Sequence, residues 1–544
     1  MVAIADDVVA EAERRGLIGR TIVCASGVSP SGPIHLGNLR EVMVPHLVAE
    51  ELRARGIDCD HILSWDDFDR LRKVPAGVAE SFADHIGRPL SRVPDPWGEL
   101  ASYAERFKEP FRAALRALGI PLREISQTEA YTGGAYNESI VLAMERREAI
   151  RDTLLHYRTL EREDHDESES GYYPFRVYCE ACGTDQTAIQ AWRGGPATIA
   201  YSCHHCGHRG DFSLHDKVPG KLVWKADWPM RWAHESVMFE SGGVDHSSHG
   251  SSFTVGAELV RKVFGALPPH YVGYSFVGTS GQAKMSGSAG GGFLPEDALR
   301  ILEPAVLRWL YARRRPNQAI TVDFGAEVLR TYDEWDTLAR RVADGTATPF
   351  ESATHRRSVA TSLGALPATP RPMSFRLLSS VVDLTQGAPV QLVRVLRDSG
   401  GAATAALALE DVEPRLTCAA NWVERHMPAE DRTVVRAEPA MERLASLSGD
   451  ERGALDLLLD GLDGSWTLEG LTELVYAIPK LQRGLPADAR PSAEVKAAQR
   501  AFFVLLYQLL VGRDAGPRLP TLVLSLGSGR VRELLGGRPA PASR

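Results

Sequence analysis

Two Cys-x-x-Cys pairs, Cys179 with Cys182 and Cys203 with Cys206, are separated by twenty residues. Zinc needs soft ligands that converge tetrahedrally, and each pair delivers two thiolates from one tight turn. A redox dithiol is the alternative for a single pair, whereas two pairs at this spacing favour a metal. Because four thiolates leave no open coordination position, we predict one structural Zn²⁺ and no catalysis at this site.

A second chemical signal lies near the N-terminus, in the glycine-, serine- and proline-rich residues 26–38. They follow a short β-type run over residues 21–25 and open an amphipathic helix that stops at Gly56. Backbone N–H groups at a helix start are unpaired, and the helix dipole favours an anion there. His35, two residues before Gly37, adds a side-chain donor. The stretch therefore predicts a phosphate site, with an ordinary strand–turn–helix as the alternative.

The elements that position this turn are predicted to form a parallel sheet. A second β-type run over residues 60–65 follows the helix and leads into Asp66 and Asp67. A strand, a crossover helix and a second strand make a βαβ unit of Rossmann type. Ligands on such sheets bind at the carboxyl ends of the strands, where the turn and both aspartates lie.

Periodicity and composition predict the remaining elements. The helices expected outside the βαβ unit cover residues 8–16, 98–158, 255–265, 304–311 and 325–343, and then a string over 350–544. Residues 221–232 hold three tryptophans and read as sheet-like material. A strand over residues 271–277 runs into a glycine-rich loop over 278–292 with a single lysine, Lys284.

The composition is that of a globular protein of about three or four domains. Of its 544 residues, 44% are hydrophobic and 24% charged. The net charge of −8 does not indicate a nucleic-acid binder, although arginine clusters provide local basic surface. With no signal peptide and no run near the ~18 apolar residues of a membrane span, we expect a cytoplasmic protein with no membrane contact. The single cysteines Cys24, Cys59 and Cys418 read as reduced thiols, and we favour a monomer.

Two motifs together resemble those of the class I aminoacyl-tRNA synthetases. Residues 30–38 are similar to the "HIGH" signature of that class, and residues 284–288 are similar to its "KMSKS" loop. Within the class the chain looks most like the class I lysyl-tRNA synthetases. The supporting stretches are residues 64–75, 224–232, 245–246, 307–310 and 516–519, so the resemblance covers essentially the whole chain.

The resemblance implies an α/β Rossmann-type catalytic domain with an inserted zinc ribbon, followed by an all-α C-terminal anticodon-binding domain like that of glutamyl-tRNA synthetases. The expected segments are a first catalytic part (1–165), the ribbon (166–216), a second catalytic part (217–300), a helical connector (301–348) and the anticodon-binding domain (349–544). The implied reaction activates L-lysine with ATP to lysyl-adenylate and transfers it to tRNA, expected to be tRNA-Lys.

The resemblance places ATP at the two motifs. The expected ATP-binding residues are Pro30, Ser31, Gly32, His35, Gly37, Asn38, Lys284, Met285, Ser286 and Ser288. Among them His35 and Asn38 would hold ATP, and Lys284 would neutralise charge on the leaving pyrophosphate with Mg²⁺ assisting. Since phosphoryl transfer needs positioning and charge neutralisation, these three are the expected catalytic residues.

The amino acid is expected beside the ATP. The resemblance points to Gly27, Ser29, Trp224, His246 and Tyr274, and aromatic walls suit the methylenes and the ammonium of lysine. We add Asp66 because the α-ammonium also needs an anion. Simple core packing is the alternative for the three tryptophans, Trp224, Trp228 and Trp232, and a capped loop position is the alternative for His246.

Two departures from the family pattern matter. Gly287 replaces the second lysine of "KMSKS", which leaves Lys284 alone to activate ATP. Family members can carry a second zinc site after an Asp-Pro-x-Gly-Cys-His pattern. Here Asp95 begins that pattern, but Glu99 and Leu100 stand at the last two positions, so we expect one zinc ion.

Three other functions compete with the lysine ligase. The first is a synthetase paralogue for another amino acid or a non-tRNA acceptor, and the helical C-terminal part argues against it. The second is a non-catalytic RNA-binding or regulatory protein, which would have no use for His35, Asn38 and Lys284. The third, a generic nucleotidyltransferase with a "HIGH"-type motif, would be far shorter.

Overall fold

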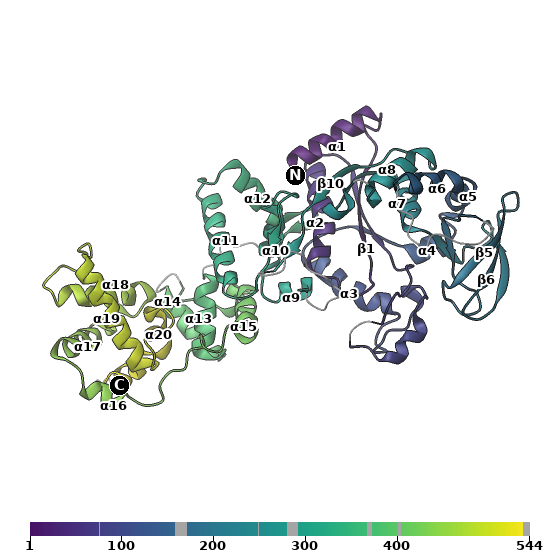
Figure 1. The fold of residues 1–544 in the computed structure, drawn as a ribbon. Coiled ribbons are helices and arrows are strands. Elements are labelled where there is room, and N and C mark those ends of the chain that lie inside the picture. The colour runs from purple at the N-terminus through teal and green to yellow at the C-terminus, as the bar shows by residue number, and fades with distance from the viewer. Residues whose placement is uncertain are drawn as a thin grey trace. The chain divides into compact units, whose positions relative to one another are not determined.

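A five-stranded parallel sheet lies at the centre of the first part of the chain (Figure 1). Its strand order is β10-β9-β1-β2-β3, and the bounds are β1 Ile22–Val28, β2 Cys59–Trp65, β3 Arg123–Ser126, β9 Val237–Gly243 and β10 His270–Tyr274. β1 pairs in parallel with β2 on one side and β9 on the other. The helix α2 (Leu36–Ala54) crosses from β1 to β2, which confirms the predicted βαβ unit.

Helices cover both faces of this sheet, so its central strands are apolar on both sides. Ile22 and Cys24 pack against α2 and the N-terminal helix α1 (Val2–Arg14). Val23 and Ala25, which alternate with them, face α7 (Trp224–His234) and α8 (Ser252–Lys262). The period of two along β1 thus assigns successive residues to opposite helical layers.

Two predictions of secondary structure are wrong. The strand β3 lies within residues 98–158, where only helices were expected. β3 is a four-residue edge strand with exposed Arg123 and Glu124, so it has no apolar run to reveal it. Residues 221–232 are a short strand, β8 (Gly220–Leu222), followed by helix α7. The three tryptophans there are four residues apart, a spacing that places them on one helix face.

The cysteine-rich insertion forms a small antiparallel sheet of its own. It consists of β5 (Thr187–Arg193), β6 (Thr198–Cys203) and β7 (Arg209–Ser213), in that order. The chain enters and leaves it through β4 (Phe175–Val177) and β8, which pair antiparallel. We call residues 175–222 the ribbon.

The computed structural model describes residues 1–74, 77–157, 171–248, 250–279, 292–366, 373–400 and 404–536. The chain divides into two compact units. The first comprises Met1–Leu299, Pro304–Val322 and Thr348–Pro367, and the second Arg300–Glu303, Asp323–Ala347 and Ala368–Arg544. The segment boundaries implied by the family resemblance stay a prediction.

The other elements of the first unit surround the sheet. They are η1 (Glu80–His85), η2 (Leu90–Arg92), α3 (Tyr103–Ala117), α4 (Gln127–Thr132), α5 (Asn137–Glu145), α6 (Arg147–His156), η3 (Val244–His246), β11 (Val277–Gly278), α9 (Pro295–Leu299), α10 (Pro304–Ala312), β12 (Ile320–Thr321), α12 (Pro349–Val359), β13 (Ala360–Thr361) and β14 (Gly364–Ala365). β11 pairs in parallel with β12. No helix within the described ranges is long and apolar enough to span a bilayer.

The second unit is built from helices in the part of the chain that the structure describes. They are α11 (Glu327–Ala343), α13 (Phe375–Thr385), α14 (Pro389–Ser399), η6 (Leu409–Val412), α15 (Arg415–Arg425), α16 (Met441–Ala445), α17 (Gly449–Gly461), η7 (Asp463–Ser465), α18 (Leu468–Leu481), α19 (Ala493–Leu510), α20 (Leu519–Leu526) and α21 (Ser528–Leu534). Within this unit Arg415 is fully buried and ion-paired at 2.8 Å with both Glu303 and Asp336, so three segments distant in sequence are joined.

Candidate active site

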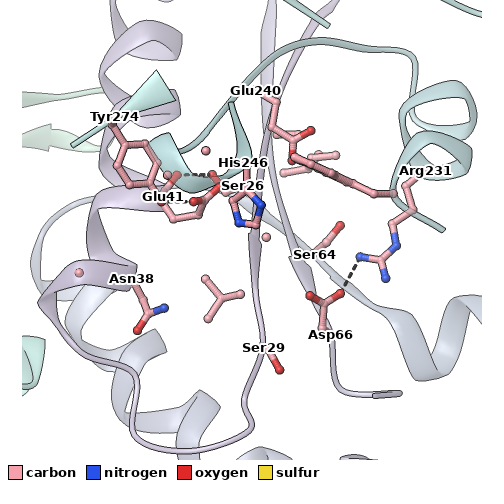
Figure 2. A pocket seen from close by; sticks show the side chains of 18 of the residues that line it. Ser26, Ser29, Asn38, Glu41, Ser64, Asp66, Arg231, Glu240, His246 and Tyr274 are labelled. Atoms are coloured by element: carbon pink, nitrogen blue, oxygen red, sulfur yellow. Dashed lines mark hydrogen bonds and ion pairs between the residues drawn. The ribbon is translucent and has the colours of Figure 1, made fainter. Parts of the chain in front are cut away.

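A pocket of about 300 Å³ opens at the carboxyl ends of β1, β2, β9 and β10 (Figure 2). This is the edge of a parallel sheet at which ligands bind. The lining includes all six residues predicted to contact the amino acid: Gly27, Ser29, Asp66, Trp224, His246 and Tyr274. It also includes His35, Gly37 and Asn38 from the first motif, so the structure brings both predicted groups together on one cavity.

The start of α2 is closed by a capping box, which corrects the expectation of unpaired backbone N–H groups there. The His35 side chain accepts a hydrogen bond from Gly37 N at 3.1 Å, and Asn38 Oδ1 accepts one from His35 N at 3.1 Å. Leu36 N donates to Phe293 O at 2.9 Å. The contact with an anion therefore falls to the side chains at this helix start.

Gly37 is required by the way His35 folds back over the helix start. A Cβ atom at Gly37 would lie 2.8 Å from His35 Nδ1, closer than such atoms approach. The His-x-Gly-Asn spacing of the sequence thus encodes one local structure, in which histidine and asparagine cap the helix and glycine leaves room for the ring.

Of the residues predicted to bind ATP, those described by the structure line the pocket only in part. Pro30, Ser31 and Gly32 do not line it, and Ser31 O instead accepts a hydrogen bond from Tyr103 Oη at 2.9 Å. Lys284, Met285, Ser286 and Ser288 lie outside the described residues, so their predicted roles stay predictions.

Glu41 is a pocket residue that the sequence reasoning missed. It follows Asn38 by three positions, which places it on the same face of α2, and its carboxylate accepts a hydrogen bond from Tyr274 Oη (Figure 2). Burial raises the pKa of Glu41 to about 8, and the nearby carboxylates of Glu240, Asp245 and Asp66 act in the same direction. An acid in a cavity whose pKa lies near neutral pH can ionise when a cation binds beside it.

Aromatic rings from α7 form one wall of the pocket. Trp224 stacks on Trp228 with ring centroids 5.2 Å apart, and His246 meets the edge of Trp228 at 5.9 Å. The indoles of Trp228, at 3.0 Å, and Trp232 both donate to Glu240, whose pKa burial raises to about 7. The two deeper tryptophans therefore serve as core and as pocket lining at once.

Asp66 lines the pocket opposite the Glu41–Tyr274 pair (Figure 2). It forms an ion pair of 2.6 Å with Arg231, which also binds Asp227 one helical turn away. Asp66 is 9% exposed, and burial raises its pKa while Arg231 opposes that shift. The carboxylate predicted to bind the α-ammonium is thus already oriented by a guanidinium.

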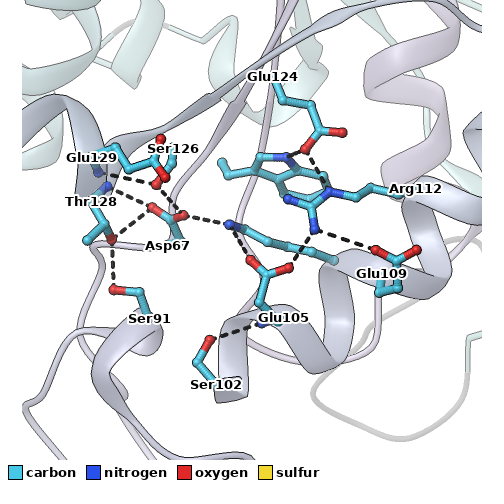
Figure 3. Close-up of polar contacts among 12 residues, drawn as sticks. Asp67, Ser91, Ser102, Glu105, Glu109, Arg112, Glu124, Ser126, Thr128 and Glu129 are labelled. Carbon is cyan, nitrogen blue, oxygen red and sulfur yellow. Dashed lines mark hydrogen bonds and ion pairs between the residues drawn. The ribbon is translucent and has the colours of Figure 1, made fainter. Parts of the chain in front are cut away.

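The neighbouring Asp67 is buried, is not part of the pocket lining and belongs to a polar network (Figure 3). Its carboxylate accepts hydrogen bonds from Lys108 Nζ at 2.6 Å, Ser126 Oγ at 2.8 Å, and Thr128 N and Oγ1 at 2.8 and 3.0 Å. Lys108 is only 3% exposed and also contacts Glu105 at 3.0 Å. This network fixes the end of β2 against β3, α3 and α4, and so fixes the backbone of Asp66.

Replacing Asp67 with alanine is expected to destabilise the first unit by about 3 kcal/mol, because Lys108 would lose a buried partner. The measurement is urea unfolding followed by tryptophan fluorescence. Asp152→Ala, which breaks the exposed pair of Asp152 with Arg151, is the control and should cost less than about 1 kcal/mol. Equal unfolding midpoints for the two variants would contradict this reading of the network.

The four cysteines of the ribbon converge as predicted. All four sulfur atoms lie within 4.8 Å of one another, with Cys179 Sγ 3.7 Å from Cys206 Sγ and Cys182 Sγ 3.7 Å from Cys203 Sγ. A tetrahedron with Zn–S bonds of about 2.3 Å has edges of about 3.8 Å, so the donor set fits Zn²⁺ in type and in size.

Asp95, the remnant of the second zinc pattern, has other partners. Its carboxylate forms a 2.6 Å ion pair with Arg106 and accepts hydrogen bonds at 2.9 Å from the backbone of Glu99 and Leu100. The hydrogen bonds from Arg106 hold the pKa of Asp95 well below its usual range. These contacts tie the loop over residues 95–100 to the Asp95 carboxylate.

This chain is similar to known proteins over most of its length. Residues 1–364 match a family described as "tRNA synthetases class I (K)". A lysine–tRNA ligase of Streptomyces coelicolor is 49% identical, covering 98% of this chain and 97% of that protein. The lysine–tRNA ligase of Pyrococcus horikoshii is 34% identical and the match covers 96% of each chain. That of Treponema pallidum is 31% identical and the match covers 94% of each chain. The similarity thus extends over both compact units.

Proposed function

This chain belongs to the class I (K) tRNA synthetases, and we propose that it is a lysine–tRNA ligase whose activation step takes place in the pocket at the carboxyl ends of β1, β2 and β9. The reaction joins the lysine carboxylate to the α-phosphate of ATP and releases pyrophosphate. The lysyl group then passes to tRNA.

One observation carries the assignment of the pocket to lysine. Among the described residues, five carboxyl groups and one guanidinium line the cavity: Glu41, Asp66, Glu235, Glu240 and Asp245, with Arg231. A cavity with this excess of acid favours a ligand with two ammonium groups. Aromatic rings of α7 offer apolar contact for the methylenes between those groups.

We assign the two ends of lysine to the two sides of the pocket. Glu41, held by Tyr274, would take the ε-ammonium, because a cation bound beside this acid would stabilise its ionised form. Asp66 would take the α-ammonium, with Arg231 orienting it. Gly27 and Ser29 on β1, with Trp224 and His246, would contact the rest of the amino acid.

ATP would lie between the amino acid and the start of α2. His35 and Asn38 would bind it through their side chains, since the backbone N–H groups there have partners. Lys284 would neutralise charge that develops on the leaving pyrophosphate, and a bound Mg²⁺ would supply further charge neutralisation. No side chain needs to act as a nucleophile in this step.

The remaining parts of the chain have supporting roles in this proposal. Cys179, Cys182, Cys203 and Cys206 would hold a structural Zn²⁺, which stabilises the ribbon. The helices of the second unit would bind the anticodon arm of tRNA-Lys, since the relatives named lysine–tRNA ligase match along that region as well.

The decisive test is amino-acid-dependent exchange between ATP and pyrophosphate. It should be run with and without tRNA, on lysine, ornithine, arginine and glutamate, with reactions lacking an amino acid as the baseline. We expect exchange with lysine in the presence of tRNA, and far weaker exchange with the other amino acids. No exchange with any amino acid in the presence of tRNA would overturn the proposed function.

A further inference from the structure

Arg40 is a buried cation that the activation chemistry above does not use. It lies on α2 two residues after Asn38 and is 2% exposed. Its guanidinium donates to five backbone carbonyls, those of Ser275 (2.7 Å), Phe276 (3.5 Å), Arg315 (3.2 Å), Pro316 (2.9 Å) and Gln318 (2.8 Å). Burial lowers the pKa of Arg40. Within the described residues, the five hydrogen bonds of its guanidinium all go to carbonyl oxygens, whose dipoles stabilise the buried charge.

The carbonyls belong to two segments that Arg40 joins. Residues 275–276 connect β10 to β11, and residues 315–318 lead into β12, the partner of β11. The same two segments are also joined directly, because Ser275 Oγ donates to Asn317 O at 2.8 Å and Ser275 N to Pro316 O at 2.9 Å. Arg40 thus fixes the two segments that enter β11 and β12 to the helix that carries His35 and Asn38.

The segment that Arg40 holds forms a wall of the pocket. Tyr274, Phe276 and Val277 line the cavity, and Tyr274 is bonded to Glu41, the residue next to Arg40. Gly278 ends β11 and begins the glycine-rich sequence that contains Lys284. On the far side of that sequence, Phe293 O is bound by Leu36 N of α2. Both flanks of residues 279–292 are therefore attached to the first two turns of α2.

We infer that Arg40 is a positioning residue for amino-acid activation, which sets the wall over residues 274–278 against the His35–Asn38 helix start. This inference rests on the proposed function, which places lysine beside the wall over residues 274–278 and ATP beside the start of α2. An arginine is needed because its planar fork reaches several carbonyls in two segments at once, whereas the three donors of an ammonium all lie on one nitrogen. A displacement of the wall by about 1 Å would cost about a hundredfold in rate.

The test compares Arg40→Lys with Arg308→Lys. Arg308 is also buried, at 1% exposure, and binds the backbone carbonyls of Leu118 and Arg357 with His46, away from the pocket lining. We expect Arg40→Lys to lower the kcat of tRNA-supported, lysine-dependent exchange by about tenfold to a hundredfold. Its dissociation constant for lysine, measured by tryptophan fluorescence, should change less than about threefold because the carboxylates of Glu41 and Asp66, on α2 and after β2, remain in place. Arg308→Lys should lose comparable thermal stability and keep its kcat.

A second variant keeps the inference testable if Arg40→Lys does not fold. Ser275→Ala removes only the hydroxyl that joins the same two segments, and it should lower kcat about threefold with lysine binding unchanged. Equal kcat values for the wild type, Arg40→Lys and Ser275→Ala would overturn the inference, as would a loss of kcat in Arg308→Lys as large as in Arg40→Lys. Absence of exchange in the wild-type protein would instead refute the proposed function.

Discussion

Replacing Glu41 with glutamine is expected to weaken lysine binding about a thousandfold, equivalent to about 4 kcal/mol. The carboxylate lies in the pocket beside Tyr274, where little water competes for a bound ammonium. An uncharged amide of the same shape removes the carboxylate that we assign to that ammonium. Titration of the tryptophan fluorescence with lysine measures the loss, since Trp224 and Trp228 line the same cavity.

The pH dependence of lysine binding provides a second readout for Glu41. Burial raises the pKa of Glu41 to about 8 in the empty pocket, so the group is mostly protonated at neutral pH. Because an ammonium binds the ionised form, binding releases a proton below about pH 8. Lysine affinity should therefore rise by up to about tenfold per pH unit below that value and level off above it. In Glu41→Gln most of this slope should vanish, leaving the smaller part due to Glu240, whose pKa is about 7.

Glu50→Gln is the matched control for Glu41→Gln. Glu50 lies on the same helix α2, but its carboxylate binds Arg53 at 3.0 Å and Ser362, outside the pocket lining. It should bind lysine as the wild type does. If Glu41→Gln kept the affinity and the pH slope of the wild type, the assignment of the ε-ammonium to this side of the pocket would fail.

Local motifs predicted the helix start and the cluster of four cysteines, because each is encoded within a few residues, but they did not predict that the backbone N–H groups of that helix start have partners. His35, Gly37 and Asn38 form one capping box, and two knuckles supply all four sulfur atoms. Glu41 was missed because an acid inside an amphipathic helix resembles a solvent-exposed residue, and only the approach of Tyr274 from β10 shows otherwise. The backbone carbonyls around Arg40 could not be predicted from the sequence, because every residue has a backbone carbonyl.

Errors of secondary structure arose where tertiary packing decides the conformation. Residues 221–232 resemble a strand because tryptophan favours sheets, and residues 221–222 do end strand β8. From Trp224 onward the segment is the helix α7, and Glu240 on β9 binds two of its indoles. β3 is short and charged, and pairing with β2 makes it a strand. In both places the deciding partner lies elsewhere in the sequence, so local propensity was a weak guide.

Removal of the Zn²⁺ proposed for the ribbon is expected to reduce lysine-dependent exchange about a hundredfold, through structure and not through chemistry at the metal. Three contacts join the ribbon to residues 68–70, directly after Asp66. Tyr178 Oη donates to Phe68 O at 2.6 Å, Lys221 pairs with Asp69 at 2.5 Å, and Asp185 pairs with Arg70 at 2.8 Å. Since Tyr178 precedes Cys179, unfolding of the knuckle would release the segment that orients Asp66.

Cys203→Ser tests this expectation, with Cys418→Ser as its control. Cys418 is a buried thiol of the second unit, so the same substitution there should leave about one zinc ion bound per chain and leave exchange intact. Cys203→Ser should lose the zinc, become sensitive to protease within the ribbon and bind lysine more weakly. A zinc-free Cys203→Ser protein with wild-type lysine affinity would show that the ribbon does not support the pocket.

The hydroxyl of Tyr178 separates this structural link from general damage to the ribbon. Tyr178→Phe removes only the bond to Phe68 O, and it should keep the zinc while weakening lysine binding about fivefold. Tyr201→Phe removes a comparable hydroxyl, which accepts a hydrogen bond from Glu180 N next to the same knuckle. If the two phenylalanine variants bound lysine equally well, the hydroxyl of Tyr178 would not carry the effect of zinc loss to Asp66, and the ion pairs of Asp69 and Arg70 would be the next contacts to test.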